Sequence, residues 1–197
     1  MILTKYGIHI LPFDASMTKE EIEESINSHP AGDRLKMIYA ETPANPTNAL
    51  IDLKMCVEVA KNFSKVDDKV LVAVDNTFMG PLWQHPLELG CDLVLYSATK
   101  YIGGHSDVIA GACLGSNKLI GKVKEMRTFL GNMCGPWTGW LLMRSLETLK
   151  ARMSIQEKNA KEVAGFLRDH EAVNKVHYLG FPNTEKQKKI LKEQKFF

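Results

Sequence analysis

Short apolar runs and longer amphipathic stretches alternate along the N-terminal part of the chain. The apolar runs are rich in Val, Ile and Leu and are typical of buried strands; they cover 35–41, 69–74, 92–96 and 108–114. Helical spacing of apolar residues predicts helices over 18–26 and 50–63, with a short helical stretch near 86–89. Strands that alternate with helices predict an α/β fold with a mostly parallel sheet and crossover helices.

Helical spacing dominates the chain from Lys118 onward. The predicted helices cover 118–129, 137–148 and 151–170, and the turn-rich segment 131–136 separates the first two. A strand-like run at 172–178 precedes a lysine-rich helix that we expect to continue to Phe197. The sheet-forming part is therefore followed by a helical segment and by the beginning of a further α/β unit.

Composition and charge restrict the class of protein. The 197 residues are 45% hydrophobic and 24% charged, which is enough for one full domain core. The 25 basic and 23 acidic residues give a net charge of +2, too balanced to favour a nucleic-acid or membrane partner. No apolar stretch approaches the roughly 20 residues of a membrane helix, and the first residues lack the pattern of a signal peptide.

The cysteines argue against metal chemistry. Cys56, Cys91, Cys113 and Cys134 are widely spaced, and none forms a C-x-x-C pair. We therefore expect no metal site and no disulfide framework, and reduced thiols in a cytoplasmic interior fit best. The sequence also lacks G-x-G-x-x-G, Walker and H-E-x-x-H motifs, so nucleotide-binding and zinc-hydrolase functions have no support.

Polar side chains follow two of the predicted strands at the point where each strand ends. Asp75 directly follows the second apolar run, and Lys100 follows the third, together with the hydroxyls of Ser97 and Thr99. Open α/β sheets bind ligands at the carboxyl ends of their strands, so chemistry is expected here. A lysine can form an imine with a phosphorylated aldehyde, hydroxyls can hold its phosphate, and an acid can hold a protonated ring nitrogen. This set predicts pyridoxal 5'-phosphate as the cofactor.

Each of these residues also has an ordinary structural interpretation. Lys100 could extend from a loop into solvent, although the following segment 103–105 (Gly-Gly-His) permits close backbone approach. Asp75 could form an Asx turn or cap the next helix. Ser97 and Thr99 could satisfy backbone groups at the strand end. The functional interpretation of Asp75 gains from Lys100, because a pyridinium requires an anion opposite the imine side of the ring.

Asn45 and the tryptophans are further candidates. Asn45 lies between Pro43 and Pro46, so its backbone is largely fixed. It is either part of a rigid surface turn or a preorganised amide donor to an oxygen beside the reactive carbon. The tryptophans are interpreted as core or interface packing; they are Trp83, Trp137 and Trp140.

A set of motifs in the chain is specific for one family. The matching stretches are Glu41-Thr42-Pro43-Ala44-Asn45-Pro46, Val74-Asp75-Asn76-Thr77-Phe78 and the segment 97–105, extended by 106–111 and 144–149. With them, the chain resembles the Cys/Met metabolism (transsulfuration) family of pyridoxal-phosphate enzymes. That family includes cystathionine gamma-synthase, cystathionine gamma-lyase, methionine gamma-lyase and O-acetylhomoserine sulfhydrylase. The resemblance runs from near Tyr6 to about Gly180.

The resemblance implies a role for each candidate residue. Lys100 would form the imine with the cofactor and move protons on the substrate, and Asp75 would pair with the pyridine nitrogen. Ser97 and Thr99 would hold the phosphate, and Asn45 would contact the phenolic oxygen of the ring. The implied reaction is γ-elimination or γ-replacement on a sulfur-containing amino acid. The implied protein is a homo-oligomer with shared active sites.

The resemblance also implies a domain organisation. Residues 1–150 would form a partial large domain of the type I PLP-transferase fold, 151–171 a long connecting helix, and 172–197 the truncated start of a small domain. The family's phosphate-binding turn, ring-stacking aromatic and substrate-carboxylate arginine have no match here, so the chain resembles an internal fragment. Two alternatives to an active enzyme stay open: a catalytically incomplete module for PLP binding or subunit association, and a flavodoxin-like nucleotide binder.

Overall fold

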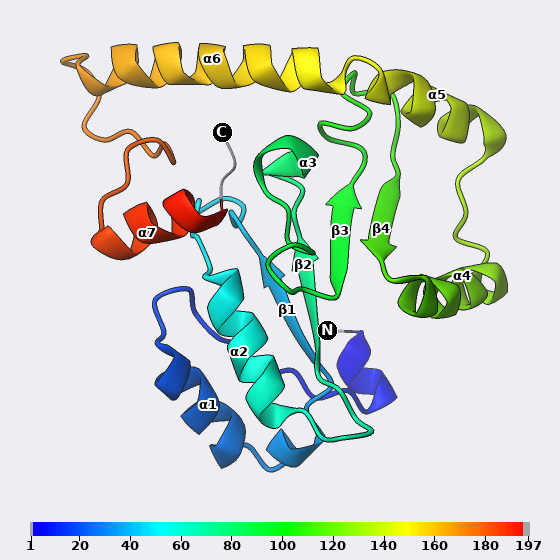
Figure 1. The fold of residues 1–197 in the computed structure, drawn as a ribbon. Helices are drawn as coiled ribbons and strands as arrows, with labels where there is room; N and C mark the ends of the chain where they lie inside the picture. The colour runs from blue at the N-terminus through cyan, green and yellow to red at the C-terminus, as the bar shows by residue number, and fades with distance from the viewer. Residues whose placement is uncertain (1, 195–197) are drawn as a thin grey trace.

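A four-stranded sheet organises the chain. The computed structural model describes residues 2–194. The strands β1 (Met37–Glu41), β2 (Leu71–Asp75), β3 (Leu93–Ser97) and β4 (Gly111–Gly115) lie side by side in chain order. Strands β1, β2 and β3 are parallel, and β4 is antiparallel to β3 (Figure 1). The predicted α/β fold with a mostly parallel sheet is confirmed.

One face of the sheet carries the main hydrophobic core. Helix α2 (Leu53–Phe63) packs on this face, and its apolar residues at helical spacing form the stripe that is buried. The helix begins at Asp52, whose carboxylate accepts a hydrogen bond of 3.1 Å from the backbone N–H of Met55. The buried side chains from the sheet and the helix include Ile38, Ala40, Val72, Val74, Leu53, Cys56, Val59 and Ala60.

Helix α1 (Lys19–Ser28) adds a second helix to the same core. The Thr18 hydroxyl accepts from the backbone N–H of Glu21 (3.2 Å), and the Glu21 carboxylate accepts from the N–H of Thr18 (2.7 Å). This capping box defines where the helix begins. Ile22 and Ile26, one turn apart, are buried in the core. Two 3-10 helices lie on either side of α1 in the sequence: η1 (Leu3–Tyr6) and η2 (Gly32–Arg34).

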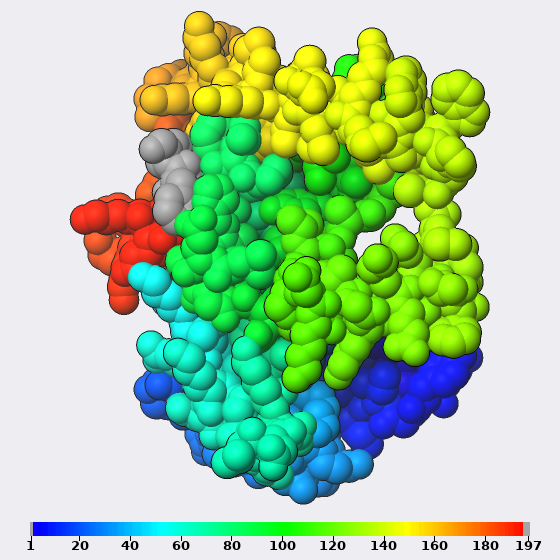
Figure 2. Space-filling model, turned by 45° about the vertical axis from the view of Figure 1, so that its right-hand side comes forward, coloured from blue at the N-terminus to red at the C-terminus, as the bar shows by residue number. Residues whose placement is uncertain are grey.

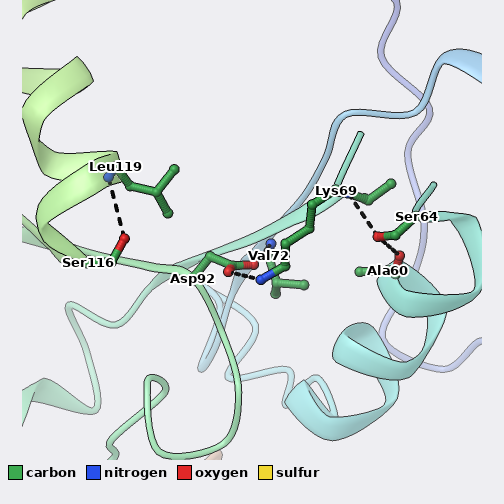
Figure 3. Close-up of polar contacts among 8 residues, drawn as sticks. Ala60, Ser64, Lys69, Val72, Asp92, Ser116 and Leu119 are labelled. Atoms are coloured by element: carbon green, nitrogen blue, oxygen red, sulfur yellow. Dashed lines mark hydrogen bonds and ion pairs between the residues drawn. The ribbon is translucent and has the colours of Figure 1, made fainter. Parts of the chain in front are cut away.

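Asp92 links the beginnings of β2 and β3 (Figure 3). One carboxylate oxygen accepts a hydrogen bond of 3.0 Å from the backbone N–H of Val72, and the other pairs with the Lys69 amine. Nearby, the Ser64 hydroxyl accepts from the N–H of Val70 (2.9 Å) at the entrance to β2. These contacts hold the strand beginnings, at the edge of the sheet opposite to the candidate residues.

Replacing Asp92 with alanine is expected to lower the free energy of unfolding by about 1–3 kcal/mol, because the buried N–H of Val72 loses its acceptor. Urea unfolding of the variant and the wild type measures the difference. Asp67 is exposed, so Asp67→Ala is the matched control and should change stability by less than about 0.5 kcal/mol. Equal effects of the two substitutions would contradict a role for Asp92 in joining the strands.

Helices α4 (Asn117–Leu130) and α5 (Pro136–Leu146) lie at the periphery of the molecule. Neither helix buries a residue, and Figure 2 shows an opening between this yellow-green segment and the rest of the chain. Trp137 is 79% exposed, so core packing is wrong as an interpretation of this residue. The exposed apolar side chains of the two helices include Met126, Phe129, Leu130, Trp140 and Met143.

The C-terminal helices return to the sheet. In Figure 1 the carboxyl ends of β1, β2 and β3 are directed towards helix α6 (Leu149–Arg168), and the side chain of Met153 in this helix is buried. Helix α7 (Glu185–Gln194) packs close to the beginning of α2, where Lys54 pairs with Glu193 (3.6 Å). A second, smaller cluster of buried side chains joins α7 to the loops after β1 and β2; it consists of Leu50, Met79 and Ile190.

Several local predictions differ from the structure. Residues 86–89 form turns, and the short helix in this region is α3 (Gly80–Trp83), with a proline in its first turn. The predicted strand at 172–178 is wrong, because no strand of the described chain lies beside it to pair with. Strand β4 is not parallel, because the chain returns through 98–110 without a crossover helix. The predicted helix to Phe197 is α7, and 195–197 lie outside the described residues.

The cysteines are all free, and they differ widely in exposure. Burial raises the pKa of Cys56 to about 12, with an added effect of the Asp52 charge. Burial likewise raises the pKa of Cys91 to about 12, with smaller effects from Cys56 and Asp92. At about pH 8 such a pKa leaves a reactive thiolate fraction on the order of 10⁻⁴.

We therefore expect a thiol reagent at about pH 8 to modify the exposed Cys134 and to leave Cys56 and Cys91 unmodified in the folded chain. Peptide mass mapping measures the modification at each position. In denaturant, all of these thiols should react. Modification of Cys56 in native conditions as fast as that of Cys134 would show that the core around α2 is not formed.

Candidate active site

The carboxyl ends of β1, β2 and β3 meet at one edge of the sheet. The strand register places Glu41 beside Asp75, and Asp75 beside Leu95. Ser97 lies two residues beyond Leu95 and so points to the same face as Asp75, because side chains alternate along a strand. This face is opposite to the one packed against α2, so both side chains point away from the main core.

The half-buried Asp75 carboxylate has one oxygen engaged and one open. Its Oδ1 accepts from the backbone N–H of Thr77 (3.0 Å). This contact forms the Asx turn that the structural interpretation of Asp75 predicts. Its Oδ2 accepts no hydrogen bond from residues 2–194, so this oxygen is accessible to a further donor. Burial raises the pKa of Tyr39, and the charges of Asp75 and Glu41 raise it further. Negative charge therefore gathers at this edge and favours a cationic ring nitrogen.

Ser97 and Thr99 differ in how their hydroxyls are used. The backbone N–H of Ser97 donates to the Thr77 hydroxyl oxygen (2.7 Å), which ties the loop after β2 to the end of β3. The Ser97 hydroxyl has no hydrogen-bond partner in the described chain and is half-buried. The Thr99 hydroxyl donates to the Ala110 carbonyl (3.3 Å) and accepts from the Ala110 N–H (3.1 Å). Ser97 therefore offers a hydroxyl to a ligand, whereas the Thr99 hydroxyl joins the turn to the chain entering β4.

Lys100 lies in the turn that follows β3, and its side chain is exposed. Its backbone N–H donates to the Ser97 carbonyl (3.1 Å), and its carbonyl accepts from the N–H of Gly104 (2.7 Å). The amine is thus accessible to a ligand on a hydrogen-bonded turn. No part of residues 2–194 buries it, so the side chain lies as in the structural interpretation of a lysine that extends from a loop into solvent.

Asn45 lies in the loop that follows β1. Its backbone N–H donates to a carboxylate oxygen of Glu41 (3.1 Å), and its side chain is exposed. The peptide bonds that precede Pro43 and Pro46 are both cis. The turn is therefore tied to the end of β1, where Glu41 lies beside Asp75 in the strand register.

A buried polar network behind this edge is not evident from the sequence. The Asn76 amide donates to the carbonyls of Gly80 (3.1 Å) and Gln84 (2.9 Å) and to the Tyr96 hydroxyl (3.0 Å). The Gln84 amide donates to the Asn76 side-chain oxygen (2.8 Å) and to the Thr42 carbonyl (3.1 Å). Asn76, Gln84 and Thr42 are each fully buried, so their hydrogen bonds join the loops that follow β1 and β2 inside the molecule.

Only part of this network leaves a signal in the sequence. Asn76 directly follows Asp75 at a strand end, and this position makes a polar side chain a candidate functional residue. Gln84 has no comparable signal. Its partner Gln194, which donates to it at 3.3 Å, lies 110 residues away, so no local pattern connects the two.

The donor set fits pyridoxal 5'-phosphate. An accessible primary amine, an open carboxylate oxygen and an unpaired hydroxyl lie on adjacent strand ends, which is the chemistry that an aldehyde, a ring nitrogen and a phosphate require. Residues 2–194 contain no cluster of His, Cys, Asp and Glu that could hold a metal ion. No helix in this part of the chain is long and apolar enough to cross a membrane.

The fold is that of α/β enzymes, and the donor set is compatible with the chemistry of pyridoxal phosphate. The chain belongs to the family described as Cys/Met metabolism PLP-dependent enzyme, whose model matches residues 1–197. The resemblance read from the sequence motifs is therefore confirmed, and the cofactor of the family is the predicted one.

The relatives of the chain include cystathionine gamma-lyases, cystathionine beta-lyases and methionine gamma-lyases. The chain is 40% identical over 183 residues to cystathionine gamma-lyase of Bacillus subtilis (strain 168), which covers 92% of this chain and 45% of that protein. It is 39% identical over 185 residues to cystathionine beta-lyase of Lactococcus lactis subsp. cremoris, covering 93% of this chain and 46% of that one. The solved structure of cystathionine gamma-lyase from Lactobacillus plantarum, complexed with L-serine, matches with a TM-score of 0.86 and 32% identity, covering 98% of this chain and 48% of that chain. The chain therefore spans less than half the length of each of these relatives.

Proposed function

We propose that this chain is part of a pyridoxal-phosphate-dependent enzyme that catalyses γ-elimination or γ-replacement on a sulfur-containing amino acid. The observation that carries the proposal is the common edge of β2 and β3, where Asp75 and Ser97 share a face and Lys100 follows on an ordered turn. The names of the relatives support cystathionine or methionine as the type of substrate.

Each candidate residue has a task in this proposal. Lys100 attaches the cofactor through its amine and moves protons on the substrate. Asp75 holds the protonated ring nitrogen through its open oxygen, and Asn45 donates to the phenolic oxygen. Ser97 donates to the phosphate, and Thr99 belongs to the same site, where its hydroxyl holds the turn. When bound, pyridoxal phosphate supplies an electron sink that stabilises negative charge at the substrate's α-carbon.

The proposal extends to the organisation of the protein. Residues 1–150 contribute part of the large domain, 151–171 the connecting helix, and 172–197 the beginning of the small domain. The exposed apolar surface of α4 and α5 supports a homo-oligomer, because surfaces of this kind mark subunit contacts. The free cysteines are compatible with a cytoplasmic location.

A second candidate is a module that binds the cofactor or partner subunits without turnover. One observation favours it for this chain by itself: the Lys100 side chain is exposed. The two candidates differ in one property, because only the enzyme would convert a substrate to product.

The test of both candidates starts with labelling. The purified chain is mixed with pyridoxal phosphate and reduced with borohydride, and the modified lysine is identified by peptide mass spectrometry. We expect one pyridoxyl group on Lys100. Incubation with cystathionine then separates the reactions, because γ-elimination yields 2-oxobutanoate and β-elimination yields pyruvate. Labelling without product would support the binding module, and labelling spread over exposed lysines would refute a built cofactor site.

A further inference from the structure

Arg152 joins helix α6 to the turn that carries Lys100. Its Nη1 donates to the Tyr101 carbonyl (2.8 Å), and its Nη2 donates to the Ile102 carbonyl (3.3 Å). These two residues directly follow Lys100 in the sequence, although 51 and 50 positions separate them from Arg152. A single side chain therefore binds two successive carbonyls of the turn that carries Lys100.

Arg152 also binds the junction between α5 and α6. Arg152 Nη2 also donates to the Ser145 carbonyl (2.8 Å), and its Nε donates to the Thr148 hydroxyl (3.0 Å). The next residue, Met153, is 3% exposed, so the helix is packed against the molecule at this point. These contacts orient the guanidinium towards the turn that carries Lys100.

Gly104 provides the space for the guanidinium. A Cβ at this position would lie 1.9 Å from Nη1 of Arg152, so the guanidinium would have to move away from the turn. Gly104 has a φ of +75°, a left-handed conformation that glycine adopts without strain. Its N–H donates to the Lys100 carbonyl (2.7 Å), so the turn closes around Lys100 just where the guanidinium binds.

From these contacts we infer that Arg152 is a positioning residue that fixes the backbone after Lys100 and thereby sets where the Lys100 amine is presented to the cofactor. The inference rests on the proposed function of Lys100. Its chemical basis is the fixed fork of N–H donors in a guanidinium, which can serve several carbonyls at once. A lysine amine at the same place would be a single point donor and could not hold both carbonyls with the same geometry.

The test compares Arg152→Met and Arg152→Lys with the wild-type chain. Lys150→Met is the matched control, because Lys150 is exposed on the same helix and its loss removes one positive charge. The first readout is amide hydrogen exchange of Gly103 and Gly104, whose N–H groups are bonded within the turn. The second readout is the fraction of Lys100 that borohydride traps at subsaturating pyridoxal phosphate.

Arg152→Met should raise the exchange rate of these two amides by roughly tenfold to a hundredfold, as expected for the loss of hydrogen bonds from a charged donor. Trapping at Lys100 should fall in the same variant, Arg152→Lys should change both readouts in the same direction, and the control should change neither. Unchanged exchange and trapping in a folded Arg152→Met chain would overturn the inference. If Arg152→Met does not fold, Arg152→Lys decides, and wild-type behaviour in both readouts would overturn it.

The two proposals fail in different ways. If borohydride traps nothing at Lys100 in the wild-type chain, the proposed function fails and the inference falls with it, whatever the exchange rates show. If the wild-type chain is trapped at Lys100 and the arginine variants are trapped equally, the proposed function stands and the role of Arg152 is refuted.

Discussion

Replacement of Lys100 with alanine is expected to abolish the pyridoxyl label that borohydride fixes on the chain. The reason is chemical, because the label requires a primary amine that the cofactor aldehyde can reach, and Lys100 presents one on an ordered turn at the strand ends. Any turnover of the chain should also fall by roughly 10²–10⁴-fold, since the same amine is proposed to move protons on the substrate. Peptide mass spectrometry measures the label, and release of the oxo acid measures turnover.

Two further variants test whether the effect is due to the primary amine of Lys100, and not to its positive charge or to the loss of any one lysine. Lys100→Arg keeps the positive charge but lacks a primary amine, so it should behave like Lys100→Ala. Lys118→Ala removes an exposed lysine from the first turn of α4 and should leave the label unchanged. A label of undiminished amount in Lys100→Ala, carried by another lysine, would show that this turn does not form the cofactor site.

The three parallel strands could be predicted from the sequence because each is a short apolar run that ends in a polar residue. Strand β2 ends at Asp75 as predicted, and β3 ends at Ser97, one residue beyond the predicted run. The direction of β4 could not be predicted from its own residues, because direction depends on whether the connection contains a crossover helix. The run 172–178 has strand-like composition, but a strand requires a neighbour, and composition does not supply one.

The candidate site divides in the same way. Asp75 and Ser97 could be placed at one edge from the sequence, since consecutive parallel strands bring their ends together. The use of the Thr99 hydroxyl could not be predicted, because its partner Ala110 directly precedes β4, the strand that unexpectedly returns antiparallel. The contacts of Arg152 are also long-range, and an arginine on an amphipathic helix gives no sign that it points inward. Sequence patterns indicated the candidate ligand-binding groups, but they did not indicate the long-range contacts that hold these groups in place.

The burial of Gln84 leads to the second large expected effect. Gln84 is fully buried; its amide donates to Asn76 and to the Thr42 carbonyl, and its side-chain oxygen accepts from Gln194. Gln84→Ala would remove all three contacts and leave a cavity among buried polar atoms. Each unsatisfied buried group costs about 1–3 kcal/mol, and a cavity adds to this. We therefore expect a loss of about 3–5 kcal/mol in the free energy of unfolding, measured by urea denaturation.

The matched control for this prediction is Gln156→Ala, because Gln156 is exposed on α6 and the same atoms are removed there; its effect should stay below about 0.5 kcal/mol. Amide exchange adds a spatial test. Loss of Gln84 should expose the N–H of Leu53, since Gln194 holds that N–H at 2.7 Å and is itself held by Gln84. If Gln84→Ala unfolds at the same urea concentration as the control, the buried amides do not join α7 to the strand ends. The end of β2 at Asp75 and the loop that carries Asn45 must then depend on the sheet alone for their position.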